Sequence, residues 1–244
     1  MASDPYAQIE REFASAESAR AIDQLTEQQR ATLRAYWLAR ADGELTTALS
    51  FEFMLDDLRE LGAPGALTAL AERAVHEEHQ HSDWCVRWAK RLGAGELASA
   101  RLLGTRALTF AGARSDEQRL LRTVFGSCFS ETVAVHVLRA SQLLIRIESV
   151  RVLNHQHMRE ELDHARLGWG LLAWEGITRR EREMVRHYVP EITALTRATW
   201  MSSERTASDA LHAFGYLSGP LVDQACEEAL ETVVMPGLER LGVL

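Results

Sequence analysis

The sequence predicts an all-α protein, and three observations support this fold class. The 244 residues include only five prolines and 15 glycines, so long stretches contain no residue that breaks a helix. Within these stretches apolar residues recur at the spacing of a helix with one buried face. No run of β-branched residues alternates with a period of two over the length of a strand. We therefore expect helices and no sheet.

Start and stop signals divide the first half of the chain into three helices. A short leading helix is expected over about residues 5–21, followed by a long periodic segment over about residues 27–61. Gly62 ends this segment and Pro64 opens the next helix, which runs to about Leu92. Proline suits the first turn of a helix, and glycine suits the position just after its end.

The second half repeats this arrangement after a long connection. Residues 94–114 contain three glycines and no sustained helical pattern, so we expect them to form a crossover between the halves. Ser115 is a candidate N-cap for a helix to about residue 147, and the fourth helix covers about residues 149–174. Residues 178–181, Thr-Arg-Arg-Glu, have the sequence of a capping box that starts a fifth helix.

We expect a single domain over residues 1–244, because a chain of this length with 46% hydrophobic residues can bury a substantial core. The core of the domain is a helical bundle over about residues 27–176. A C-terminal helical extension follows over about residues 178–244. This extension is expected to break at residues 215–220 and to close at residues 235–237.

One pattern of carboxylates and histidines occurs twice in the chain. Each copy has a lone glutamate and, 34 or 30 residues later, a Glu-x-x-His unit. On a helix the ends of this unit lie about one turn apart on one face, so they can chelate one metal ion. One Glu from each of two helices and Glu-x-x-His from two others form the ligand set of a four-helix bundle with two metal ions. The two copies are Glu44 with Glu78-x-x-His81 and Glu131 with Glu161-x-x-His164.

The spacing of the pattern distinguishes it from chance. Random placement gives about one Glu-x-x-His in such a chain, so a single occurrence carries little weight. Half of 34 residues spans ~25 Å along a helix. If the next helix runs back antiparallel over the same length, its Glu-x-x-His unit lies at the level of the first glutamate. The alternative for Glu44 is an exposed acid, with Glu52 as the replacement ligand. Glu77 and Glu160 point ~100° away from the ligand face and are expected to face water or neighbouring helices.

His157 extends the second copy of the pattern. It precedes Glu161 by four residues and His164 by seven, so the three side chains lie within ~60° of each other around the helix axis. The matching position in the first half is Ala74, which would make the two metal positions unequal. The alternative is that His157 lies beside the ligands or faces solvent.

With these residues the chain resembles the ferritin-like di-iron carboxylate superfamily. The added His157 is similar to a ligand in its arylamine (p-aminobenzoate) N-oxygenase subgroup. The resemblance covers about residues 30–175 and implies a ferritin-like four-helix bundle with a dinuclear metal site and additional C-terminal helices. It also implies that Glu78 and Glu161 bridge two irons. The first iron would take Glu44 and His81, and the second Glu131, His157 and His164.

The resemblance implies a non-haem di-iron oxygenase that activates O2 to oxidise a small organic substrate, with an amine nitrogen as the group suggested by the subgroup. The cofactors would be two iron ions, Fe2+/Fe3+, with manganese as an alternative, because both metals accept carboxylate and imidazole ligands. O2 would be the co-substrate, and an external electron donor would be required. No catalytic residue beyond the metal ligands is assigned. Candidate pocket walls, whose default role is core packing, are Phe51, Trp84, Trp88, Phe125, Phe129 and Trp169.

Two other function classes stay open. A ferritin-like, rubrerythrin-like or catalase-like protein that handles iron or peroxide would use similar ligands, although the chain has no Cys-x-x-Cys rubredoxin module. A metal-free helical interaction protein would leave the repeated pattern unexplained. Monomer and homodimer are both compatible with the sequence.

Charge and cysteine content bound the partners and the compartment. The net charge of −8 argues against nucleic acid and anionic membrane surfaces, because both are bound by clustered Lys and Arg. No apolar run approaches the length of a membrane span, and the N-terminus does not have the pattern of a signal peptide. Cys85, Cys128 and Cys226 are scattered singletons, which predicts no disulfide framework. We expect a cytoplasmic protein with neither a nucleic-acid nor a membrane partner.

Overall fold

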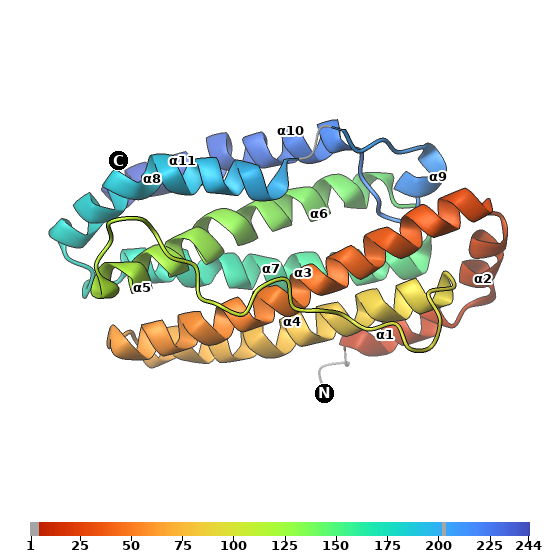
Figure 1. The fold of residues 1–244 in the computed structure, drawn as a ribbon, viewed down its shortest axis with the longest axis horizontal. Coiled ribbons are helices and arrows are strands. Elements are labelled where there is room, and N and C mark those ends of the chain that lie inside the picture. The colour runs from red at the N-terminus through yellow and green to blue at the C-terminus, as the bar shows by residue number, and fades with distance from the viewer. Residues whose placement is uncertain (1–4, 202–203) are drawn as a thin grey trace.

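The computed structural model describes residues 5–201 and 204–244, and the regular structure in these ranges is entirely helical (Figure 1). The predicted all-α class is therefore confirmed for the described part of the chain. The leading helix expected over residues 5–21 is two helices, α1 (Pro5–Phe13) and α2 (Ala16–Asp23). The chain turns between them because the Ser15 side chain accepts a hydrogen bond from the backbone N–H of Ser18 and caps α2.

Helices α3 (Glu27–Glu60) and α4 (Gly65–Arg91) form an antiparallel pair (Figure 1). Helix α3 begins with a capping box in which the Thr26 and Gln29 side chains each accept a hydrogen bond from the other residue's backbone N–H. Between the two helices, Gly62 has a φ of 67°, a left-handed conformation that glycine adopts without strain. The helix boundaries predicted here agree with the structure within a few residues.

Residues 92–114 connect α4 to the second half and run along the outside of the molecule, as predicted for the crossover (Figure 1). Side chains of α3 hold this segment. The Asp42 carboxylate accepts a hydrogen bond from the backbone N–H of Arg101 at 2.7 Å, and the Thr46 hydroxyl accepts one from Leu103 at 2.9 Å. Because the connection spans the molecule, the helices on either side of it run in the same direction.

The helix expected over residues 115–147 contains a π-helical segment that the sequence does not indicate. It comprises α5 (Ser115–Thr123), the π-helical η1 (Val124–Glu131) and α6 (Thr132–Leu144). A π-helix widens the turn and rotates the side chains that follow it, and such segments are frequent at functional sites. Glu131 is the last residue of η1. Helix α7 (Glu148–Ala173) then returns alongside this segment.

The C-terminal part of the chain covers one side of the second half (Figure 1). It contains α8 (Arg179–Trp200), α9 (Asp209–His212), α10 (Gly219–Ala229), the π-helical η2 (Leu230–Val234) and α11 (Met235–Arg240). The expected capping box before α8 is present. The expected end at residues 235–237 is wrong, because α10, η2 and α11 follow one another without a break to Arg240, with Pro236 in the first turn of α11.

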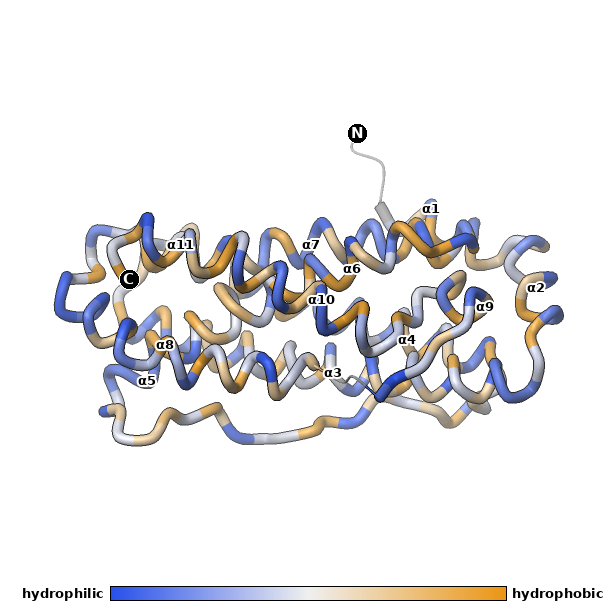
Figure 2. Tube along the Cα trace, turned by 90° about the horizontal axis from the view of Figure 1, so that it is seen from above, coloured by the Kyte–Doolittle hydropathy of each residue, from blue (hydrophilic) through white to orange (hydrophobic). Residues whose placement is uncertain are grey.

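The apolar faces of α3, α4 and α7 are each divided into two parts by the predicted ligands. Figure 2 shows hydrophobic and hydrophilic residues interspersed along the helices, as expected for helices that each bury one face. The buried apolar residues form two clusters, and along α3, α4 and α7 the predicted ligands lie between them. The candidate site is therefore closed on both sides by apolar side chains. One cluster contains Trp37, Trp88 and Leu153, and the other contains Phe51, Phe129 and Leu167.

Two further contacts fix the helices around the site. A bidentate ion pair links α3 to α5, because Arg122 donates to both oxygens of Asp57 at 2.6 and 2.5 Å. Gly168 allows α7 to approach η1 closely, since a Cβ atom there would lie 2.6 Å from the Cys128 Sγ. Within the described residues no helix is both long and apolar enough to cross a membrane.

Candidate metal centre

The structure brings all seven predicted site residues together in one cluster inside the helices. Six of the seven are buried, and Glu44 is partly exposed. Three overlapping groups within the cluster each offer ligand atoms that lie within 4.8 Å of one another. These groups are Glu44, His81 and His157; Glu44, Glu78, His81 and Glu161; and Glu78, Glu131, Glu161 and His164.

Glu78 and Glu161 stand between the two histidines of the repeated motif. One oxygen of Glu78 lies 3.5 Å from the Nδ1 of His81, and the other lies 3.0 Å from the Nδ1 of His164. Glu161 divides its oxygens in the same way, at 3.3 Å from His81 and 2.8 Å from His164. Each of these carboxylates thus faces two positions at once. This is the geometry that a carboxylate needs to bridge two cations.

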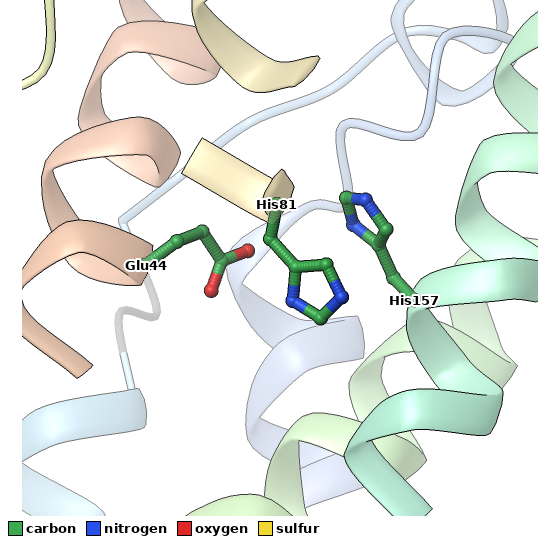
Figure 3. A group of neighbouring side chains, drawn as sticks. All are labelled: Glu44, His81 and His157. Carbon is green, nitrogen blue, oxygen red and sulfur yellow. The ribbon is translucent and has the colours of Figure 1, made fainter. Parts of the chain in front are cut away.

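His157 belongs with the first of these positions. Its ring centroid is 4.0 Å from that of His81, and its ligand atom groups with Glu44 and His81 (Figure 3). The resemblance placed His157 with Glu131 and His164, and the structure corrects this assignment. The contacts of α4 with α7 show that these two helices are antiparallel. His157, four residues before Glu161, therefore lies near the level of His81 along the helix axes.

Each histidine of the motif has a carboxylate on its other ring nitrogen. The Nε2 of His81 lies 2.9 Å from Glu160, and the Nε2 of His164 lies 2.9 Å from Glu77. Each of these glutamates directly precedes the motif glutamate of the opposite helix, so the two helices support each other's histidines. A proton held on Nε2 leaves Nδ1 free as a metal ligand. The sequence showed these acids and predicted that they face water or a neighbouring helix, but not which side chain they would meet.

The two supporting carboxylates have different surroundings. Glu160 accepts hydrogen bonds from the Tyr6 hydroxyl at 2.9 Å and from the Gln156 amide at 2.6 Å. Glu77 instead forms an ion pair with Arg73 at 3.4 Å. The two halves of the cluster share the sequence motif, but the residues that surround the motif differ between them.

Burial and proximity shift the pKa values of the cluster. Desolvation raises the pKa of Glu44 to about 7 and holds the pKa of Glu131 well above its ordinary value. Burial opposes the charged forms of His81 and His164, but hydrogen bonds to the neighbouring carboxylates outweigh it and raise the pKa of both. Desolvation lowers the pKa of His157 well below its ordinary value. The protonation state of each of these groups therefore depends on the other groups of the cluster.

Several buried polar atoms of the cluster make no hydrogen bond with any described residue. They include both oxygens of Glu78, the Nδ1 of His81 and the Nε2 of His157. Buried polar atoms without partners cost free energy, and buried carboxylates in particular require a cation or proton. Their position among further carboxylates and imidazoles fits the coordination of hard or borderline metal ions.

A cavity of about 370 Å³ reaches the cluster from the side covered by the C-terminal part of the chain. Glu44, Glu131 and Glu161 border it, together with Arg40. Apolar and hydroxyl-bearing side chains of α3, η1, α6, α8 and α10 form most of the remaining wall, and Arg205 adds a second cation to it. None of the six aromatic residues proposed as pocket walls lines this cavity, and four of them are fully buried or nearly so in the apolar clusters. The aromatic side chains that do line it are Tyr36 and Trp200.

Comparison with known proteins adds no assignment. The chain matches no protein-family model, no curated protein and no solved structure.

Proposed function

We propose that the protein is a non-haem di-iron oxygenase that uses O2 to oxidise a small organic molecule. The observation that carries the proposal is the position of Glu78 and Glu161, each of which presents one oxygen to His81 and one to His164. A single metal ion would use only the oxygens that face one of the two histidines. Two ions that share both glutamates would use all four oxygens.

The ligand set supports two metal positions of different composition. The first would take Glu44, His81 and His157, and the second would take Glu131 and His164. Iron is the metal that we propose, with manganese as the alternative, because carboxylates and imidazoles suit both. When bound, such a pair supplies two electrons together for the reduction of O2. The arrangement of these ligands on four helical segments is also what a ferritin-like bundle would provide.

The protein side chains would hold the reaction in a dry and polarised site. Glu160 and Glu77 keep the two histidines oriented through their Nε2 atoms. The apolar clusters on either side exclude water, which strengthens the electrostatic interactions inside. Both effects serve chemistry at a buried centre.

The cavity favours substrate oxidation over iron storage. Its volume of about 370 Å³ lies in the range of small-molecule sites, and three candidate ligands form part of its wall. The hydroxyl of Ser130, which accepts a hydrogen bond from the Trp200 indole at 3.2 Å, gives the wall a fixed polar group. An amine nitrogen is the substrate group that we propose to test first, because the cluster includes a third histidine, as the resemblance to the arylamine N-oxygenase subgroup implies, although His157 groups with Glu44 and His81.

The test combines metal content with oxygen incorporation. Protein loaded with Fe2+ without oxygen should bind about two ions per chain and should change its optical spectrum when mixed with O2. With an electron donor and a set of arylamines, mass spectrometry should find one oxygen atom from ¹⁸O2 in the product. Glu78→Ala should lose both metal binding and product formation. Trace metal in the loaded wild type would defeat the proposal. Oxygen consumption without incorporation would favour iron or peroxide handling.

A further inference from the structure

The guanidinium group of Arg40 lies between two of the candidate ligands. Its Nε donates to Oε1 of Glu44 at 2.8 Å, and its Nη2 lies 2.8 Å from the Nδ1 of His157. The Arg40 side chain is only 14% exposed and forms part of the cavity wall. Figure 3 shows the side chains of Glu44, His81 and His157, which come from three helices and point toward one another. A cation of the protein itself thus contacts ligands of the first metal position.

The contact fixes the proton on His157. Arginine has N–H donors and no acceptor, and it stays protonated in proteins. The Nδ1 of His157 must therefore accept the hydrogen bond, which places the ring proton on Nε2. This Nε2 is buried and has no hydrogen-bond partner among the described residues.

A metal ion and Arg40 place opposite demands on this ring. A neutral imidazole binds metal through one nitrogen and carries its proton on the other. If Nδ1 binds the metal, the guanidinium has to leave it. If Nε2 binds the metal, the proton moves to Nδ1, where it would meet the N–H of Arg40. Both ways of binding end the hydrogen bond between Arg40 and His157.

We infer that Arg40 competes with the metal ion for His157, so that the first position fills only when the guanidinium moves away. This inference rests on the proposed function, because it concerns the same metal centre. The second position has no such competitor, since its separate ligands Glu131 and His164 make no arginine contact in the described part of the chain. The second position should therefore bind metal more tightly than the first.

A double-mutant cycle on Arg40 and His157 tests the competition. Mn2+ serves as the probe, and isothermal titration calorimetry measures the affinity of each position. Arg40→Met keeps a long side chain and removes the donor. It should tighten the weaker position both by ending the competition and by removing a nearby positive charge. In the His157→Ala background the charge effect and the release of Glu44 from Arg40 are left, and only the competition for His157 is gone, so the gain should be about tenfold smaller, a typical coupling between contacting residues.

A matched control comes from the same helix. Arg34 donates to the backbone carbonyl of Leu92 at 3.2 Å and lies outside the cluster, so Arg34→Met should leave both Mn2+ affinities unchanged. Equal gains for Arg40→Met with and without His157, no gain at all, or a loss in the wild-type background would overturn the inference.

The histidine ring itself gives a readout that needs no variant. In metal-free wild type with ¹⁵N-labelled histidine, NMR should show His157 with its proton on Nε2. Loading with Zn2+ should change the ring to a metal-bound form, and the Arg40 Nε–H resonance should shift with it. Unchanged His157 ring and Arg40 Nε–H resonances after loading, which would show that Nδ1 still accepts the hydrogen bond from Arg40, overturn the inference. If the wild type binds two Mn2+ and Arg40→Met changes neither affinity, this inference alone fails, whereas a wild type without metal defeats the proposed function as well.

Discussion

Replacing Glu160 with glutamine removes a charge from the support of His81 while leaving the shape of the side chain nearly unchanged. The Glu160 carboxylate lies 2.9 Å from the Nε2 of His81 and also accepts hydrogen bonds from Tyr6 and Gln156. The bonds from His81 and Tyr6 share one carboxylate oxygen, so the carbonyl oxygen of a glutamine can still accept both, but its NH2 group cannot accept the bond from Gln156. We expect His81 to be less firmly oriented and less basic in this variant.

The size of the effect follows from the contacts. A hydrogen bond to a charged group contributes about 1.5–3 kcal/mol, and loss of a carboxylate behind a ligand histidine commonly weakens metal binding about 10- to 100-fold. Because glutamine retains part of the contact, we expect about a tenfold weaker first metal position for Glu160→Gln. Glu160→Ala, which removes the whole contact, should weaken it about 100-fold.

Titration calorimetry with Mn2+ measures this effect position by position. Glu77→Gln should weaken the second position instead, because Glu77 supports His164. Glu148→Gln is the control, since Glu148 lies on the same helix but pairs with Arg151 near the surface. If the Glu160 and Glu77 variants weaken the same position, or neither differs from Glu148→Gln, the crosswise support of the histidines is refuted.

Further substitutions test the frame and the centre. Gly168→Ala should lower the free energy of unfolding by about 2 kcal/mol in urea denaturation, because its Cβ would overlap the facing η1 segment. Gly43→Ala, with no atom within 4 Å of its Cβ, should raise the free energy of unfolding by up to about 1 kcal/mol. A Gly43→Ala variant less stable than Gly168→Ala would contradict the packing. Arg122→Met should cost roughly 3 kcal/mol, since it leaves the Asp57 carboxylate buried without its partner, whereas joint replacement with Asp57→Leu should recover most of the loss in the same assay. Glu78→Ala should remove both metal ions by elemental analysis, and retention of one full equivalent would argue against bridging.

The sequence was sufficient to predict the long helices α3, α4 and α7 and the residues of the cluster. Proline, glycine and capping residues mark helix ends locally, so the boundaries of α3, α4 and α7 follow from nearby residues. The spacing of the two glutamate and histidine patterns also predicted that their residues meet, because an antiparallel return preserves the level along the axis. The structure brings the same seven residues together.

The relative positions of the helices were beyond local reasoning. Helical geometry places His157 on the face of Glu161, but its neighbour across the interface depends on how α7 is set against α4. For the same reason the partners of Glu77, Glu160 and Arg40 were not predicted. The π-helical segment η1 packs against α7 and α8, and the sequence offers no local pattern that indicates it. The cavity wall needs the C-terminal helices, whose docking no motif indicated.

The most direct measurement is the anomalous X-ray scattering of crystals loaded with Fe2+, recorded at the iron absorption edge. The account predicts two iron peaks roughly 3.5–4 Å apart, the separation typical of two-metal sites. Glu78 and Glu161 should bridge them, His157 should lie on the iron bound by Glu44 and His81, and the Arg40 guanidinium should have left the His157 ring. A single peak, peaks outside this cluster, or no iron in the loaded crystals would contradict the dinuclear centre.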